Sequence, residues 1–156
     1  MAIVAPDVAV AGLRTHQEET IVPVLPWSTL FAVGVQEIDD QHRKLVGILN
    51  RLGEAENDAA AAAMQNLILD ELTEYTILHF ATEERLMQQH GYEASTHHIG
   101  EHHHLVDAVK ALHARRAAGE TLPFDELTTF LRDWLTNHIM GSDKALGLSL
   151  NRKGVY

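Results

Sequence analysis

The sequence contains eleven histidines in 156 residues, and several of them recur at the spacing of one helical turn. His79 and Glu83 are four residues apart, so in a helix their side chains lie one above the other on the same face. His98 and His102 repeat that spacing. Three further candidate ligands stand singly along the chain: His42, His138 and Asp143. Imidazole and carboxylate groups in this arrangement are typical ligands of a transition metal.

These seven side chains are expected to converge in the interior of one fold. The five histidines and Glu83 interrupt apolar stripes, so folding would bury them. Asp143 follows His138 by five residues, too far for one helical face, and we expect Gly141 to end the helix and let the carboxylate turn back. Burying these groups without a cation would leave costly unpaired polar atoms and charge. The other histidines are expected to be solvated: His16, His90, His97, His103, His104 and His113.

The donor set predicts two iron ions. Seven nitrogen and oxygen donors exceed the four of a closed zinc site, and the chain has no cysteine for a thiolate ligand or an iron–sulfur cluster. Imidazole with carboxylate suits iron, and seven donors can serve two ions when the carboxylates bridge. Two octahedral ions need twelve positions, of which the protein fills nine and an oxo or hydroxo bridge two more. The position left open suits one small diatomic ligand.

Four segments with helical periodicity must position these residues. We predict helices at about 37–52, 59–89 and 95–117, and a fourth from Thr121 and Pro123, as cap and first turn, to Gly141. Their apolar residues alternate spacings of three and four, which is typical of an antiparallel bundle. The predicted fold is all-α, an antiparallel up-down-up-down four-helix bundle with a short segment after Gly141.

The N-terminal residues and the composition complete this prediction. Residues 1–26 lack helical periodicity and hold three prolines, so we expect an irregular N-terminal arm at 1–26 and one folded domain at 27–156. A net charge of -10 argues against nucleic acid or an anionic membrane as partner. No apolar run reaches the roughly 18 residues needed to insert into a bilayer. Without cysteine or a secretory signal pattern, a cytoplasmic location is expected.

Four runs of residues resemble the motifs of the hemerythrin family, particularly those of its single-domain bacterial members. The runs are Trp27…Val33-Gly34-Val35…Ile38-Asp39-Asp40-Gln41-His42, His79-Phe80-x-x-Glu83-Glu84-x-x-Met87, Tyr92…His98-x-x-x-His102 and Trp134-Leu135-x-x-His138-Ile139-x-x-x-Asp143. The resemblance covers about 27–150 and implies a non-haem di-iron centre that binds oxygen. It implies these ligands: His98, His102 and His138 on one iron, His42 and His79 on the other, and Glu83 and Asp143 bridging. The open position would then belong to the two-histidine iron.

Apolar side chains over the open position are expected to protect bound oxygen from water. The resemblance implies Trp134, Leu135 and Ile139 as this lining. Leu86 is the fourth candidate because it lies three residues beyond Glu83.

The favoured function is reversible binding of molecular oxygen, for storage, delivery or supply to oxygen-using enzymes, without catalysis. One alternative is an oxygen or redox sensor that docks a protein partner through residues 1–26. Another is a di-iron oxidase, peroxidase or nitric-oxide-handling enzyme. Ferritin-like di-iron enzymes use Glu-x-x-His on two helices. The chain has one such match, Glu101-x-x-His104, overlapping the pair His98 and His102, and its histidine-rich donor set favours a carrier.

Overall fold

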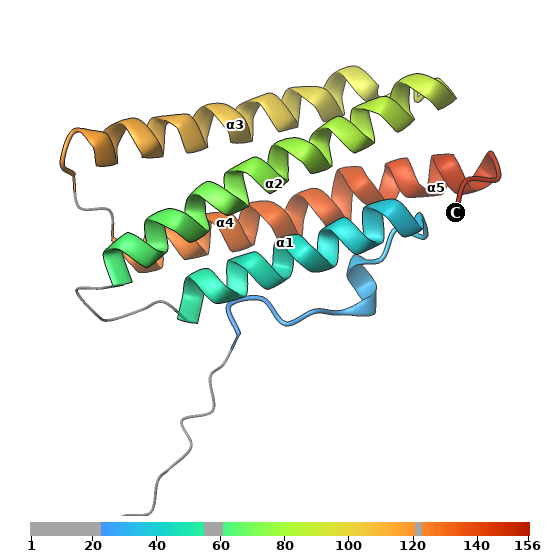
Figure 1. Cartoon of the computed structure of the whole chain (residues 1–156). Helices are drawn as coiled ribbons and strands as arrows, with labels where there is room; N and C mark the ends of the chain where they lie inside the picture. The colour runs from blue at the N-terminus through green and yellow to red at the C-terminus, as the bar shows by residue number, and fades with distance from the viewer. Residues whose placement is uncertain (1–22, 55–60, 121–122) are drawn as a thin grey trace, which may run out of the picture.

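The computed structural model describes residues 23–54, 61–120 and 123–156. Its four long helices run alternately up and down in an antiparallel bundle, which confirms the predicted all-α fold (Figure 1). The helices are α1 (Gln36–Glu54), α2 (Ala61–His90), α3 (Ser95–Ala117) and α4 (Phe124–His138). No helix in these ranges is both long and apolar enough to cross a membrane.

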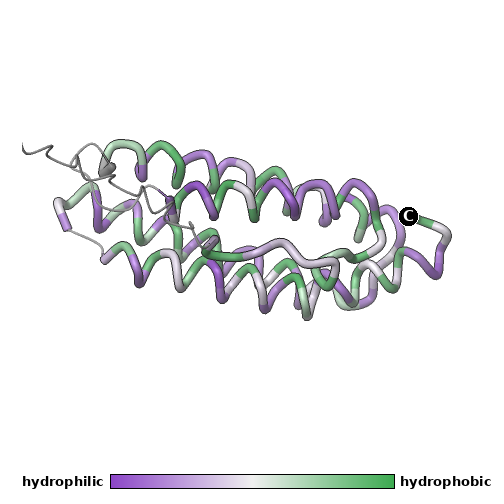
Figure 2. The backbone as a smooth tube through the Cα atoms, turned by 90° about the horizontal axis from the view of Figure 1, so that it is seen from below, coloured by the Kyte–Doolittle hydropathy of each residue, from purple (hydrophilic) through white to green (hydrophobic). Residues whose placement is uncertain are grey.

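Polar and apolar residues are interspersed along the helices (Figure 2). In α1 the stripe that carries His42 also carries four apolar residues, and all five side chains are buried. The apolar members are Ile38, Leu45, Leu49 and Leu52. Their spacing of three and four residues places them on the face that meets the other helices. A candidate metal ligand is thereby held inside the core.

Helical structure continues past Gly141, so the predicted break in the helix there is wrong. After His138 the chain passes through a π-helical turn, η2 (Ile139–Asp143), into α5 (Lys144–Arg152). A π-helical turn takes one more residue than an α-helical turn, so residues five apart can share a face. Asp143 therefore reaches the bundle interior on the same side of the helical segment as His138. At the other end Pro123 precedes the first residue of α4, and the predicted cap residue Thr121 lies outside the described residues.

An extended segment before α1 lies along that helix (Figures 1 and 2). It includes the short 3-10 helix η1 (Thr29–Phe31). Leu25 is buried in the core, its amide donates to Asn50 Oδ1 at 2.8 Å, and Asn50 Nδ2 donates to the Leu25 carbonyl at 2.9 Å. The described end of the predicted arm is thus packed on α1. Residues 1–22 lie outside the described ranges, so the division at residue 26 stays a prediction.

The first turn of α1 is fixed by Asp39. Its carboxylate accepts hydrogen bonds from the amides of Val33 at 2.6 Å and Gly34 at 3.1 Å. Gly34 has a φ of 79°, a left-handed conformation that suits glycine. This loop therefore sets the position of α1 close to the candidate ligand His42.

We expect Asp39→Ala to lower the free energy of unfolding by about 1–3 kcal/mol, because two amides lose their acceptor. Asp40→Ala is the matched control, since Asp40 contacts Gln36 and Arg43 on the surface and should cost less than about 1 kcal/mol. Urea unfolding of both metal-free variants measures the difference. Equal losses would show that the loop amides are satisfied without Asp39.

Candidate metal centre

All seven predicted ligands meet in the interior, and none is more than 5% exposed. Each of the four bundle helices, with η2, contributes at least one of them: His42 from α1, His79 and Glu83 from α2, His98 and His102 from α3, and His138 and Asp143 from α4 and η2. Their donor atoms form two groups that share Glu83, each within 4.8 Å: Glu83, His98, His102 and His138, and His42, His79, Glu83 and Asp143. Below, His98, His102 and His138 are called the three-histidine group, and His42 and His79 the two-histidine group.

Glu83 lies between the two histidine groups. Its Oε2 is 3.2 Å from His102 Nε2 and 3.3 Å from His98 Nε2. Its Oε1 is 3.8 Å from His79 Nε2. One carboxylate oxygen therefore faces each histidine group.

Asp143 repeats this arrangement. Its Oδ1 lies 3.0 Å from His98 Nε2 and 3.1 Å from His138 Nε2, both in the three-histidine group. Its Oδ2 lies 3.1 Å from His42 Nε2 in the two-histidine group. Two carboxylates that each divide their oxygens between two sets of imidazoles are the geometry required to bridge two metal ions.

Most of the donor atoms are close together without being paired by hydrogen bonds, although His98 Nε2 and His138 Nε2 lie at hydrogen-bond distance from each other, 3.1 Å. Within the described part of the chain, both oxygens of Glu83 and of Asp143, with Nε2 of His42 and His102, are buried and have no hydrogen-bond partner. Around a metal roughly 2.1 Å from each donor, donors at right angles would lie about 3.0 Å apart. The observed separations are close to that value, so the atoms converge on shared points between them. A cation at these points would satisfy groups that are otherwise costly to bury.

The protonation of these groups also suits a cation. Burial lowers the pKa of His79 to about 4, although Glu83 opposes this effect. Burial and Asp143 raise the pKa of Glu83, but His79 and contacts with His102 and His98 outweigh them and lower it to about 2. Burial lowers the pKa of His98, whereas Asp143 and Glu83 raise it to about 9. These directions favour the charged form of Glu83 and the neutral form of His79, and a metal would compete with the proton on His98.

Comparison with known proteins agrees with this geometry. Residues 33–147 match the hemerythrin HHE cation binding domain. The chain belongs to the hemerythrin family. The resemblance predicted from the four motifs is therefore confirmed, and the two buried groups form a candidate binuclear metal centre of that family.

Relatives from several organisms cover most of the chain. A bacteriohemerythrin from Stenotrophomonas maltophilia is 39% identical over 122 residues, which is 78% of each protein. Another from Methylococcus capsulatus is 36% identical over 132 residues and covers 82% of this chain and 98% of the relative. A crystal structure of wild-type hemerythrin has a TM-score of 0.75 at 34% identity, over 81% of this chain and 97% of that one.

Three polar residues that contact the candidate ligand histidines are not among the site residues predicted from the sequence. Gln41 Oε1 lies 3.0 Å from His79 Nδ1. The other two are glutamates that face the three-histidine group: Glu84 at His102 and Glu101 at His138. Gln41 and Glu84 are direct sequence neighbours of candidate ligands within the hemerythrin motifs, and this adjacency is the feature of the sequence that could identify them. Glu101 was considered only as part of Glu101-x-x-His104, but it faces His138, and His104 is exposed.

Aromatic rings stack on two histidines of the three-histidine group. Phe80 stacks on His102 with ring centroids 3.7 Å apart and nearly parallel planes, at 6°. Trp134 stacks on His138 with centroids 4.4 Å apart. Trp134 therefore restricts the orientation of a candidate ligand, in addition to its predicted role in lining the pocket.

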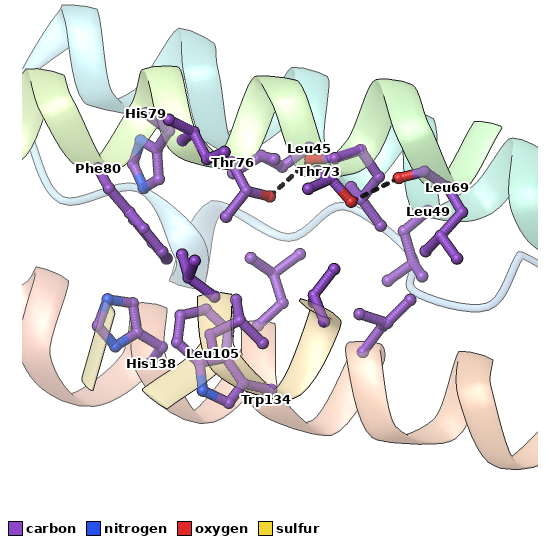
Figure 3. A pocket seen from close by; sticks show the side chains of 16 residues that line it. Leu45, Leu49, Leu69, Thr73, Thr76, His79, Phe80, Leu105, Trp134 and His138 are labelled. Atoms are coloured by element: carbon purple, nitrogen blue, oxygen red, sulfur yellow. Dashed lines mark hydrogen bonds between the residues drawn. The ribbon is translucent and has the colours of Figure 1, made fainter. Parts of the chain in front are cut away.

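An apolar cavity of about 40 Å³ adjoins the centre. Figure 3 shows the rings of His79 and His138 at one end and Leu49 and Leu69 toward the other. The volume exceeds the roughly 10–15 Å³ that one water needs, but cavities with apolar walls stay dry. The cavity is therefore a small apolar space beside His79 and His138, two of the candidate ligands.

Only two of the four predicted lining residues contact this cavity. Trp134 and Leu135 line it, whereas neither Leu86 nor Ile139 is among its described lining residues. Leu86 packs in a separate cluster with residues such as Met87, and Ile139 is buried in the main core. Leu86 does not reach the cavity because the residues of α2 that line it precede Glu83, whereas Leu86 follows Glu83.

The other histidines among the described residues lie away from the centre. His97, His103 and His104 are exposed, as expected, while His90 and His113 are half-buried. His113 Nδ1 lies 3.6 Å from Asp70 Oδ1 at the surface. His16 lies outside the described ranges.

Proposed function

We propose that this member of the hemerythrin family binds molecular oxygen reversibly at a centre of two iron ions. The observation that carries the proposal is the position of Glu83 and Asp143, each with one oxygen toward each histidine group. Seven nitrogen and oxygen donors without a thiolate favour iron over a closed zinc site. The bacteriohemerythrin relatives support the same assignment.

In this proposal the three-histidine group holds one iron, the two-histidine group holds the other, and Glu83 and Asp143 bridge them. When bound, the iron pair supplies the electrons that make oxygen binding strong yet reversible. The two-histidine position receives fewer protein donors, so we assign the open position to it. The apolar cavity at His79 and His138 provides a dry approach, and Trp134 and Leu135 keep water from the reacting atoms.

The protein should carry about two irons per chain and show a visible absorption band that appears with oxygen and disappears when oxygen is removed. Metal analysis and anaerobic spectra of the iron-loaded protein, recorded over repeated cycles of oxygen, measure both properties. The zinc-loaded protein is the control, because zinc has no redox chemistry. One tightly held zinc without iron would contradict the proposal, and so would a band that never reverses.

The alternative functions predict different results in the same experiment. An oxidase or peroxidase on this centre would consume oxygen with an added reductant over many turnovers, whereas a carrier would bind it and release it. A sensor would pass the oxygenated state to a protein partner, and the proposed docking segment lies almost entirely in residues 1–22, outside the described ranges. The cytoplasmic location stays a prediction.

A further inference from the structure

The outward nitrogens of two histidines in the three-histidine group face carboxylates. Glu101 Oε2 lies 3.1 Å from His138 Nδ1, and Glu84 Oε1 lies 3.1 Å from His102 Nδ1. Both carboxylates are partly exposed, at 35% and 37%, while the rings they contact are buried. Within the described ranges, Nδ1 of His98 has no hydrogen-bond partner. Two negative charges therefore stand behind this side of the centre.

The two-histidine group has a neutral partner instead. Thr82 Oγ1 donates its proton to the Leu78 carbonyl at 3.2 Å, so this hydroxyl accepts from Gln41 Nε2 at 3.0 Å. The amide of Gln41 is thereby oriented with Oε1 toward His79, which donates from Nδ1 and keeps Nε2 for a metal. Nδ1 of His42 has no hydrogen-bond partner among the described residues. The polar groups around the two-histidine group therefore fix the tautomer of His79 but add no charge.

We propose that Glu84 and Glu101 are positioning residues that make the three-histidine group the tighter of the two metal positions. Each carboxylate accepts the Nδ1 proton of a ligand histidine, which leaves Nε2 free and makes the ring a stronger donor to a metal. The inference depends on the binuclear centre of the proposed function, but not on its oxygen chemistry.

Glu101 is itself held by the π-helical turn. Ser142 in η2 donates a hydrogen bond to Glu101 Oε2, the same oxygen that faces His138. The turn that brings Asp143 into the site therefore also fixes the carboxylate behind the neighbouring ligand. Ring stacking by Trp134 on His138 leaves that imidazole little freedom to turn away from Glu101.

The test uses cobalt(II), added to the full chain after chelation of its metal, with calorimetry to resolve two binding steps. Wild-type protein should fill the three-histidine group first. Glu84→Gln and Glu101→Gln keep an acceptor but remove the charge, so each should weaken the first step by about 10- to 100-fold and leave the second almost unchanged. Gln41→Leu should weaken the second step instead. Glu74→Gln, at an exposed position on α2, is the matched control and should change neither step.

Proton NMR of the cobalt-loaded protein provides a second measurement. The exchangeable Nδ1 protons of His102 and His138, shifted by the paramagnetic metal, should move in Glu84→Gln and Glu101→Gln respectively. Equal weakening of both steps, or no change in either, would overturn the inference. If the two steps behave as expected but the iron-loaded protein does not bind oxygen reversibly, the proposed function fails and the positioning role of the glutamates stands.

Discussion

Glu83→Ala is expected to lose nearly all of the binuclear metal, whereas His42→Ala should retain close to one ion per chain. The reason is that Glu83 presents Oε2 to His98 and His102 and Oε1 to His79, so its loss removes a donor from both metal positions. His42 belongs to the two-histidine group only. Iron per chain, measured after gel filtration of each variant at equal protein concentration, tests the difference. Equal iron content in the two variants would contradict a bridging Glu83.

Thermal unfolding provides an independent check on Glu83. A ligand that binds only the folded state stabilises it by about 2.7 kcal/mol at a concentration 100 times its dissociation constant. Chelation should therefore lower the melting temperature of wild-type protein clearly and change that of Glu83→Ala very little. Circular dichroism before heating confirms that both proteins are folded. A similar shift in both would mean that metal binds without Glu83.

The helices, and the burial of the candidate ligands on α1, α2 and α3, could be predicted because periodicity determines their faces. Residues four apart in an α-helix share a face, and the structure places His79 with Glu83, and His98 with His102, together in the interior. Histidine and carboxylate side chains on apolar stripes are costly to bury, and a bound cation offsets that cost.

Asp143 shows where periodicity fails. Its spacing of five from His138 does not fit an α-helix, so the sequence suggested a break at Gly141. The structure instead inserts one π-helical turn, which keeps the helix continuous and brings Asp143 inward. Such turns are rare in proteins, but those that occur are often at functional sites. This one places Asp143 within 3.1 Å of His42, His98 and His138. The spacing of residues in the local sequence does not indicate where such a turn forms.

Glu101 and Leu86 could not be placed because their roles depend on neighbouring helices. Glu101 is partly exposed on α3, and its contact with His138 exists only because α4 packs beside it. Leu86 is apolar and near a ligand, but the sequence does not say on which side of the centre the cavity lies. The cavity lies along the part of α2 that precedes Glu83, and Leu135 of α4 also lines it.

Leu135→Ala is expected to fold and bind two irons, and then to lose its oxygenated form much faster than the wild type. Leu135 is 8% exposed and lines the cavity together with His138 and Trp134. Truncation of a buried leucine costs roughly 2–5 kcal/mol of folding stability. The space it leaves lies beside the candidate ligand His138, so water would gain a route to the site and would shorten the lifetime of the oxygenated form.

Leu150→Ala separates this effect from a general loss of stability. Leu150 is 1% exposed and belongs to the cluster that contains Leu86, away from the cavity. Both truncations should lower the denaturation midpoint in urea by similar amounts, because each removes the same buried atoms. Only Leu135→Ala should shorten the lifetime of the oxygenated absorption band in matched buffer, under conditions where circular dichroism shows both variants folded. If both variants decay at the wild-type rate, Leu135 acts only as a core residue; if both decay equally fast, flexibility of the whole bundle, rather than access through this cavity, controls oxidation.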